Sequence, residues 1–168
     1  MIMIKFNMLT WVPCDSRSDM EARTSEYKIL GTLLTEGSNT WGYFQTPEGF
    51  CINIGYANAG LIPQAVLLDQ RVIVGIDECL VGYDLLAGVS CFSYRMPFMF
   101  HEFVEVGDLF IVRDEMGFVG VAQDGSEQWK FCTKDVVESY AVTSSNISGK
   151  TADGLPFSFE LPVLSARP

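Results

Sequence analysis

The chain has 168 residues, 48% of them hydrophobic and 19% charged, which is typical of one folded globular domain. Its formal net charge is −10, so its surface repels phosphate backbones and excludes nucleic acid as a direct ligand, whereas a basic protein partner is compatible with it. No segment approaches the roughly 18 apolar residues of a membrane span. We therefore expect a single domain over residues 1–168 that contacts neither nucleic acid nor a membrane.

The cysteine pattern suggests a reducing compartment. The cysteines are odd in number and scattered without a C-x-x-C pair, so they indicate neither a zinc site nor a disulfide framework. Residues 1–14 superficially resemble an export signal, but the apolar run is short and Val12-Pro13-Cys14 lacks the small residues of a cleavage site. We expect a cytoplasmic protein with reduced, mostly buried thiols at Cys14, Cys51, Cys79, Cys91 and Cys132.

The N-terminal third predicts strands with one polar interruption. Residues 1–12 are apolar and predict a strand that ends before Pro13. In residues 16–27, Ser18 and Glu21 have the spacing of a capping box, and a short helix or an irregular loop are both open there. Turn residues at 36–39, 46–49 and Asp69-Gln70 then separate apolar runs. These runs predict strands at 28–35, 40–45, 49–56, 64–68 and 71–76.

A repeat dominates the rest of the chain, with copies at about 71–94 and 109–131. Each copy has an apolar strand, an Asp-Glu pair, a Val-Gly pair, a Gly-centred turn and two aromatic residues four and six positions after that glycine. Glycine after Asp or Ala favours a hairpin turn because it accepts a positive φ. The two aromatic side chains that follow are two residues apart, so they lie on one face of a strand. The second copy has one extra residue before Val119 and one fewer before Gly125.

A weaker third copy spans about 145–161. Asp153-Gly154 forms its turn, and Phe157 and Phe159 follow one residue early. Pro156 and Pro162 predict an edge strand there, because proline cannot donate to a sheet ladder. An open edge at residues 157–161 predicts a homodimer paired edge to edge.

The unit of about 38 residues, with Asp-Gly followed by Trp-x-Phe, resembles a blade of a β-propeller of the quinoprotein or WD type. The chain has no Trp-Asp or Gly-His dipeptide and is too short for four complete blades. The resemblance therefore implies an all-β, mainly antiparallel fold with at most one or two short helices. We expect a propeller-like meander that curls into a sandwich or an open barrel.

As a whole, the chain also resembles short bacterial β-meander proteins with the pattern Val-Gly-x-Asp, Gly, Glu-x-Gly-Val, Asp-Gly and Trp-x-Phe. That class includes immunity proteins of contact-dependent or polymorphic toxin systems. The resemblance implies a small acidic inhibitor that binds a toxin.

Motifs for catalysis or cofactors are missing from the sequence. His101 is the only histidine, so no site with two histidine ligands is available in one chain, and nothing around it forms a triad. Neither Gly-rich nucleotide motif occurs. We predict no catalytic residue, no metal and no cofactor.

The acidic pairs of the repeats are the first candidate site. If the repeats lie side by side, Asp77-Glu78 and Asp114-Glu115 converge on one rim and could hold Ca²⁺ or act as acid and base. Neighbouring residues of a strand point to opposite faces, however, so solvated turn acids or a contact patch for a basic partner are the other interpretations.

The aromatic stretch 96–103 is the second candidate. Its rings either fill the space between two sheets or expose an anchor patch beside Arg95. We predict a non-catalytic interaction module, an immunity-type inhibitor that binds a basic toxin or another cationic protein. The alternatives are a small-ligand or carbohydrate-binding domain that uses Trp41 and Trp129, and a carboxylate-based hydrolase. The predicted partner-binding residues are Asp77, Glu78, Asp114, Glu115, Arg95, Phe98, Phe100, His101 and Glu102.

Overall fold

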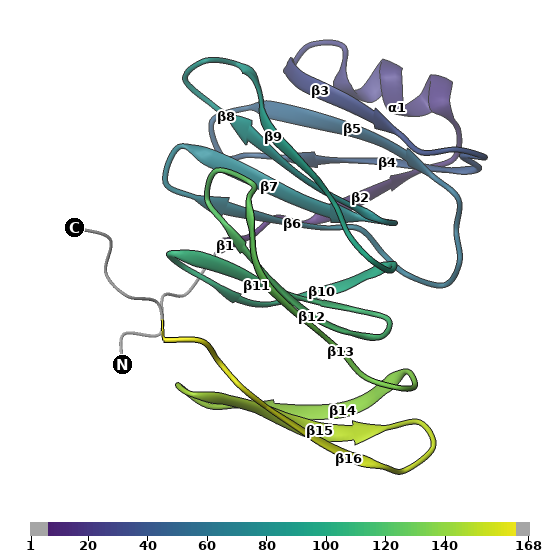
Figure 1. Ribbon diagram of the computed structural model, residues 1–168. Helices are drawn as coiled ribbons and strands as arrows, with labels where there is room; N and C mark the ends of the chain where they lie inside the picture. The colour runs from purple at the N-terminus through teal and green to yellow at the C-terminus, as the bar shows by residue number, and fades with distance from the viewer. Residues whose placement is uncertain (1–6, 164–168) are drawn as a thin grey trace.

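The computed structural model describes residues 7–163, and in that range the chain forms four β-sheets and one helix. The predicted all-β, mainly antiparallel fold is confirmed, and none of the sheets closes into a barrel. Figure 1 shows the sheets stacked face to face in chain order, from the N-terminal sheet at the top to the C-terminal sheet at the bottom. The arrangement is therefore an open stack of sheets.

The first sheet contains the one parallel pair found among the described strands. Its order is β2 (Trp11–Cys14), β4 (Thr40–Gln45), β5 (Phe50–Tyr56) and β3 (Lys28–Leu34), with β3 parallel to β5. The turn at 46–49 joins β4 to β5 as predicted, but β3 does not pair with β4. The predicted strand end before Pro13 is wrong: Pro13 lies within β2, an edge strand where its missing N–H is tolerated. Residues 1–6 lie outside the described range.

Helix α1 (Arg17–Thr24) covers the outer face of the first sheet (Figure 1). Its buried residues are Met20 and Thr24, and the Asn53 side chain of β5 donates a hydrogen bond of 3.0 Å to the Thr24 hydroxyl. The N-cap is Ser16, whose hydroxyl accepts from the Asp19 amide, and Asp19 accepts in turn from the Asp15 amide. The capping box expected at Ser18 thus lies two residues earlier.

In the other three sheets consecutive strands pair with one another, and β1 is added at the edge of the second sheet. In the second sheet, β1 (Asn7–Met8) joins β6 (Gln64–Leu68), β7 (Arg71–Ile76), β8 (Cys79–Asp84) and β9 (Val89–Arg95). The third sheet contains β10 (Phe100–Val106), β11 (Leu109–Asp114), β12 (Gly117–Ala122) and β13 (Glu127–Cys132). The fourth contains β14 (Val137–Val142), β15 (Asn146–Thr151) and β16 (Pro156–Glu160).

Each interface between consecutive sheets has its own hydrophobic core. In β7, Val72 and Val74 pack toward the first sheet, whereas Ile73 packs toward the third. In β11, Phe110 packs toward the second sheet and Ile111 toward the fourth. Because both faces of these strands are covered, their sequences are continuously apolar instead of alternating.

The Val-Gly pairs of the repeat explain how strands can carry large rings at these interfaces. Gly82 lies opposite Phe92, and Gly120 lies opposite Trp129. A Cβ at either glycine would stand 2.3 Å from the facing ring, so only glycine leaves room for it. The ladder is shifted by one residue just after each of these pairs. Gly149 and Phe157 form the same kind of pair without a shift, which accounts for the early ring in the third copy.

The thiols are less buried than predicted. All five cysteines are free, but only Cys51 is buried. Cys91 and Cys132 are exposed on β9 and β13, which are edge strands of the second and third sheets. Helix α1, the one helix in the described part of the chain, is too short to cross a membrane.

Candidate functional site

The turn between β7 and β8 supports the chain segment that leads to the third sheet. It consists of Asp77 and Glu78, and Asp77 has a φ of 45°, which aspartate tolerates better than most residues. The carbonyl of Glu78 accepts a hydrogen bond of 2.7 Å from the Met96 amide, and that of Asp77 accepts one of 2.6 Å from the Phe100 amide. The crossover 96–99 is therefore bound to this turn by its backbone.

The turn between β11 and β12 does the same for the fourth sheet. The carbonyls of Met116 and Glu115 accept from the amides of Thr133 (2.7 Å) and Val137 (3.3 Å). Glu115 also donates its amide to the carbonyl of Met99, at 3.0 Å. These turns and crossovers thus form one continuous edge, which we call the connector rim: residues 77–78, 96–99, 115–116, 133–136 and 152–155. The last turn belongs to the rim because the Ala152 amide donates to the carbonyl of Val136.

The two Asp-Glu pairs are not equivalent in three dimensions. Asp77 corresponds to Glu115, since each accepts from the first residue of the next sheet. Asp114 is instead the last residue of β11 and is 1% exposed, and its carboxylate accepts a hydrogen bond from the Met116 amide. Burial raises the pKa of Asp114, against the opposing effect of hydrogen bonds from nearby amides. The two turns have the same length, so the extra residue before Val119 is only apparent and disappears when Asp77 is matched with Glu115.

The predicted partner-binding residues gather at the connector rim and on the adjoining strand β10, but they do not form one surface. Arg95 and Glu78 form an exposed ion pair of 3.1 Å, and Phe98 is 37% exposed. Phe100 is 1% exposed and belongs to the core between the second and third sheets, together with Met96 and Phe103. The core interpretation of residues 96–103 is thus correct for most of its large side chains, with Phe98 as the exposed exception.

His101 and Glu102 belong to a polar network between the third and fourth sheets. Its centre is Arg113 of β11, which is 16% exposed. Arg113 donates to the Val137 carbonyl at 3.0 Å, its Nη2 lies 2.9 Å from Nδ1 of His101, and its Nε lies 3.0 Å from Oε1 of Glu102. The last contact is an ion pair whose N–H is not aligned for a hydrogen bond.

Tyr140 of β14 completes this network. Its hydroxyl donates to Oε1 of Glu102 at 2.9 Å, and the Arg113 guanidinium stands 5.6 Å from its ring centre. Burial and the Glu102 carboxylate raise the pKa of Tyr140. Neither Arg113 nor Tyr140 is among the residues predicted from the sequence. The available signal is an arginine directly after the apolar run Leu109–Val112, since a buried cation requires partners.

His101 has a defined protonation state in this network. A guanidinium can only donate, so Nδ1 must accept and the proton of a neutral imidazole lies on Nε2. Burial lowers the pKa of His101, and the charge of Arg113 lowers it further, against the weaker effects of Glu115 and Glu102. The ring therefore bridges two strands of the third sheet as a neutral acceptor.

The geometry does not assemble the acids around a common ion. Over residues 7–163, no three His, Cys, Asp or Glu side chains are placed to hold a metal ion together. The rings proposed for a carbohydrate site have structural contacts: Trp41 lies on Gly55, and Trp129 lies on Gly120 and 5.2 Å from Phe159.

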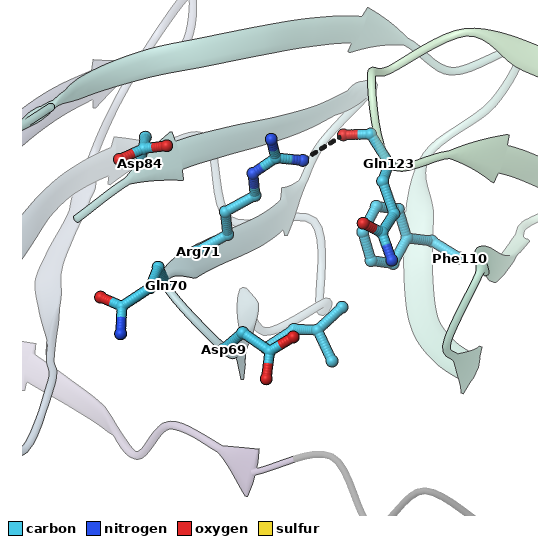
Figure 2. A pocket seen from close by; sticks show the side chains of 7 residues that line it. Asp69, Gln70, Arg71, Asp84, Phe110 and Gln123 are labelled. Atoms are coloured by element: carbon cyan, nitrogen blue, oxygen red, sulfur yellow. Dashed lines mark hydrogen bonds between the residues drawn. The ribbon is translucent and has the colours of Figure 1, made fainter. Parts of the chain in front are cut away.

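A shallow pocket of about 220 Å³ lies between the second and third sheets, on the side of the stack opposite the connector rim. Figure 2 shows Arg71 between Asp84 and the backbone of Gln123, whose carbonyl accepts a hydrogen bond of 3.0 Å from the guanidinium. Phe110 and Asp69 also line the pocket. The pocket therefore presents two carboxylates and an arginine that is already hydrogen-bonded to the backbone. This combination favours no particular class of ligand.

Acidic residues dominate the surface. All 21 acids lie in the described residues, whereas two of the 11 bases, Lys5 and Arg167, do not. Five of the bases are already paired with acids: Arg17, Arg23, Arg95, Arg113 and Lys130. The connector rim itself carries Asp77, Glu78, Glu115, Asp135 and Asp153, together with Lys134.

Comparison with known proteins assigns no family. No protein-family model matches the chain, and no curated protein matches it.

Proposed function

We propose that this protein is a non-catalytic interaction module that binds a basic protein through the connector rim, as an immunity-type inhibitor binds a cationic toxin. The observation that carries the proposal is the combination at the rim of turn acids with two exposed apolar side chains, Phe98 and Leu155. Apolar anchors surrounded by charge are typical of protein interfaces.

The rim is suited to this role because its backbone is held in place. The turns at 77–78 and 115–116 accept hydrogen bonds from the crossovers that follow them, and the turn at 152–155 donates one to the Val136 carbonyl. The acids therefore project from a surface that is ordered before binding. A preorganised surface loses little conformational entropy on association. The excess of acids over the whole molecule would also accelerate encounter with a basic partner.

The experiment compares removal of charge at the connector rim with removal of charge at the opposite strand ends of the second and third sheets. Proteins encoded beside this gene are tested for binding, first to the wild type over a range of salt concentrations. The rim variant carries Asp77→Asn and Glu115→Gln. The control carries Asp69→Asn and Asp108→Asn, in the turns on the side of the stack opposite the rim. The control is matched in charge, and Asp69 resembles Asp77 in being a turn residue with a positive φ of 50°.

We expect the rim variant to weaken binding about tenfold and the control to change it little. Raising the salt concentration should weaken binding of the wild type more than that of the rim variant. If both variants lose affinity equally, overall charge and not the rim is responsible. If no basic protein binds the wild type, the proposed function is wrong.

A further inference from the structure

The free edge of β16 offers a second, more specific point of attachment. In the described part of the chain, β16 pairs only with β15. The Thr151 amide bonds the Leu155 carbonyl, and the Leu161 amide bonds that of Ser145. Because bonded pairs alternate along an antiparallel ladder, Phe157 and Phe159 bond to β15. The backbone groups of Pro156, Ser158 and Glu160 therefore face the open edge.

Proline is compatible with this arrangement. Pro156 lacks only an N–H that would have pointed away from β15, so it costs no bond within the sheet. The edge keeps the carbonyl of Pro156 and both the N–H and the carbonyl of Ser158 and Glu160. These five backbone groups form a template for one more strand.

The preceding sheets show what an additional strand would cover. The last strand of the third sheet, β13, covers the rings of β9: the Tyr94 hydroxyl bonds Glu127 at 2.5 Å, and the turn glycine Gly125 lies against Phe92. Phe92 is accordingly only 8% exposed. In the fourth sheet β16 has the corresponding place, because its rings Phe157 and Phe159 pack on the rings of β13, and no described strand lies beyond it.

The rings of β13 nevertheless remain only half-buried. Phe131 stacks on Phe159 with ring centres 4.7 Å apart, and Trp129 lies 5.2 Å from the same ring. Both remain partly exposed. An extended segment beside β16 would bond to its edge and bury apolar side chains against these rings.

We propose that an extended segment of the basic partner adds to β16 as the fourth strand of the last sheet, in an extension that rests on the proposed function. Its alternate apolar side chains face Trp129 and Phe131. Its intervening Lys or Arg side chains face outward, where Glu160 is exposed on β16 and supplies an opposite charge across the strands. Strand addition provides affinity through the backbone, and the ring pockets and charge provide selectivity.

The test uses a synthetic seven-residue peptide that alternates lysine with valine and amide exchange measured by NMR on the full chain. The key variant is Ser158→Pro, which removes an edge-facing N–H but no backbone bond to β15; the one bond to β15 that it loses is that of the Ser158 hydroxyl, which accepts from the Asn146 side chain at 2.9 Å. The matched control is Ser93→Pro. The Met96–Glu78 bond and the register of β8 with β9 place the Ser93 N–H on a free edge as well.

We expect the peptide to slow exchange at Ser158 and Glu160 and to bind about tenfold more weakly to Ser158→Pro, with no change for Ser93→Pro. A peptide with glutamate in place of lysine should not bind. The inference is refuted if Ser158→Pro binds like the wild type or if the acidic peptide binds equally well.

Two other outcomes also decide against this occupant. Protection at Ser158 that rises with protein concentration alone would show that a second copy occupies the edge. If the rim variant weakens binding of a basic protein but Ser158→Pro does not, the proposed function stands and strand addition is wrong.

Discussion

Replacing Arg113 by methionine should destabilise the protein by about 3 kcal/mol. Methionine fills much of the same volume, so the change removes mainly the polar contacts: a hydrogen bond to the Val137 carbonyl, the ion pair with Glu102 and the contact with the Tyr140 ring. The charged hydrogen bond contributes about 1.5 kcal/mol and the ring contact about 0.5–1 kcal/mol. The ion pair contributes about 1 kcal/mol because the Glu102 side chain is 37% exposed.

The assay is urea unfolding followed by circular dichroism and tryptophan fluorescence. The control is Arg95→Met, which also removes an ion pair, but with an arginine whose side chain is 85% exposed. That variant should stay within about 0.5 kcal/mol of the wild type. Equal shifts for both variants, or a loss below about 1 kcal/mol for Arg113→Met, would refute the structural role assigned to this network.

Two further predictions concern His101 and the paired glycines. The pKa of His101 is lowered in the folded state. The neutral imidazole therefore contributes fully to the free energy of unfolding above its unfolded pKa of about 6.5, and this contribution is lost as the pH falls through the folded pKa. Unfolding free energy between about pH 5.5 and 7 should therefore rise with pH, and His101→Gln should flatten that slope; an unchanged slope would contradict the geometry at Arg113. Gly120→Ala places a methyl group 2.3 Å from the Trp129 ring and should cost about 1–3 kcal/mol with altered tryptophan fluorescence, whereas Gln128→Ala on the exposed strand surface should have little effect.

The regular part of this fold could be predicted from the sequence because it depends on local rules. Asp69-Gln70 forms the expected hairpin, and the aromatic residues after Gly88 and Gly125 lie in shared cores between sheets. Strand alternation and turn chemistry act over a few residues and are visible in one sequence. The choice between a sandwich and an open barrel could not be predicted, because the sequence of a meander does not specify how its strands divide into sheets.

The errors concern interactions between distant residues. The pairing of β3 with β5 depends on a crossover that no turn motif announces. The apparent match of Asp77-Glu78 with Asp114-Glu115 concealed a shift of one residue, which became clear only from the bonds to the next sheet. Arg113 and Tyr140 are 27 residues apart in the sequence, and their contact exists only because two sheets stack. No local pattern encodes such contacts.

The fourth sheet differs from its neighbours in having only one apolar face. Its inner face carries Tyr140, Ile147 and Phe157, whereas the outer face carries Ser139, Ser148, Lys150 and Ser158. Repeat proteins end in units of this kind, because a polar outer face removes the drive to bury another layer. Helix α1 has the same effect at the opposite end. Growth of the stack is thus terminated by the composition of one sheet face, and replacing those serines by valine or leucine would convert a polar end into a surface prone to polymerisation.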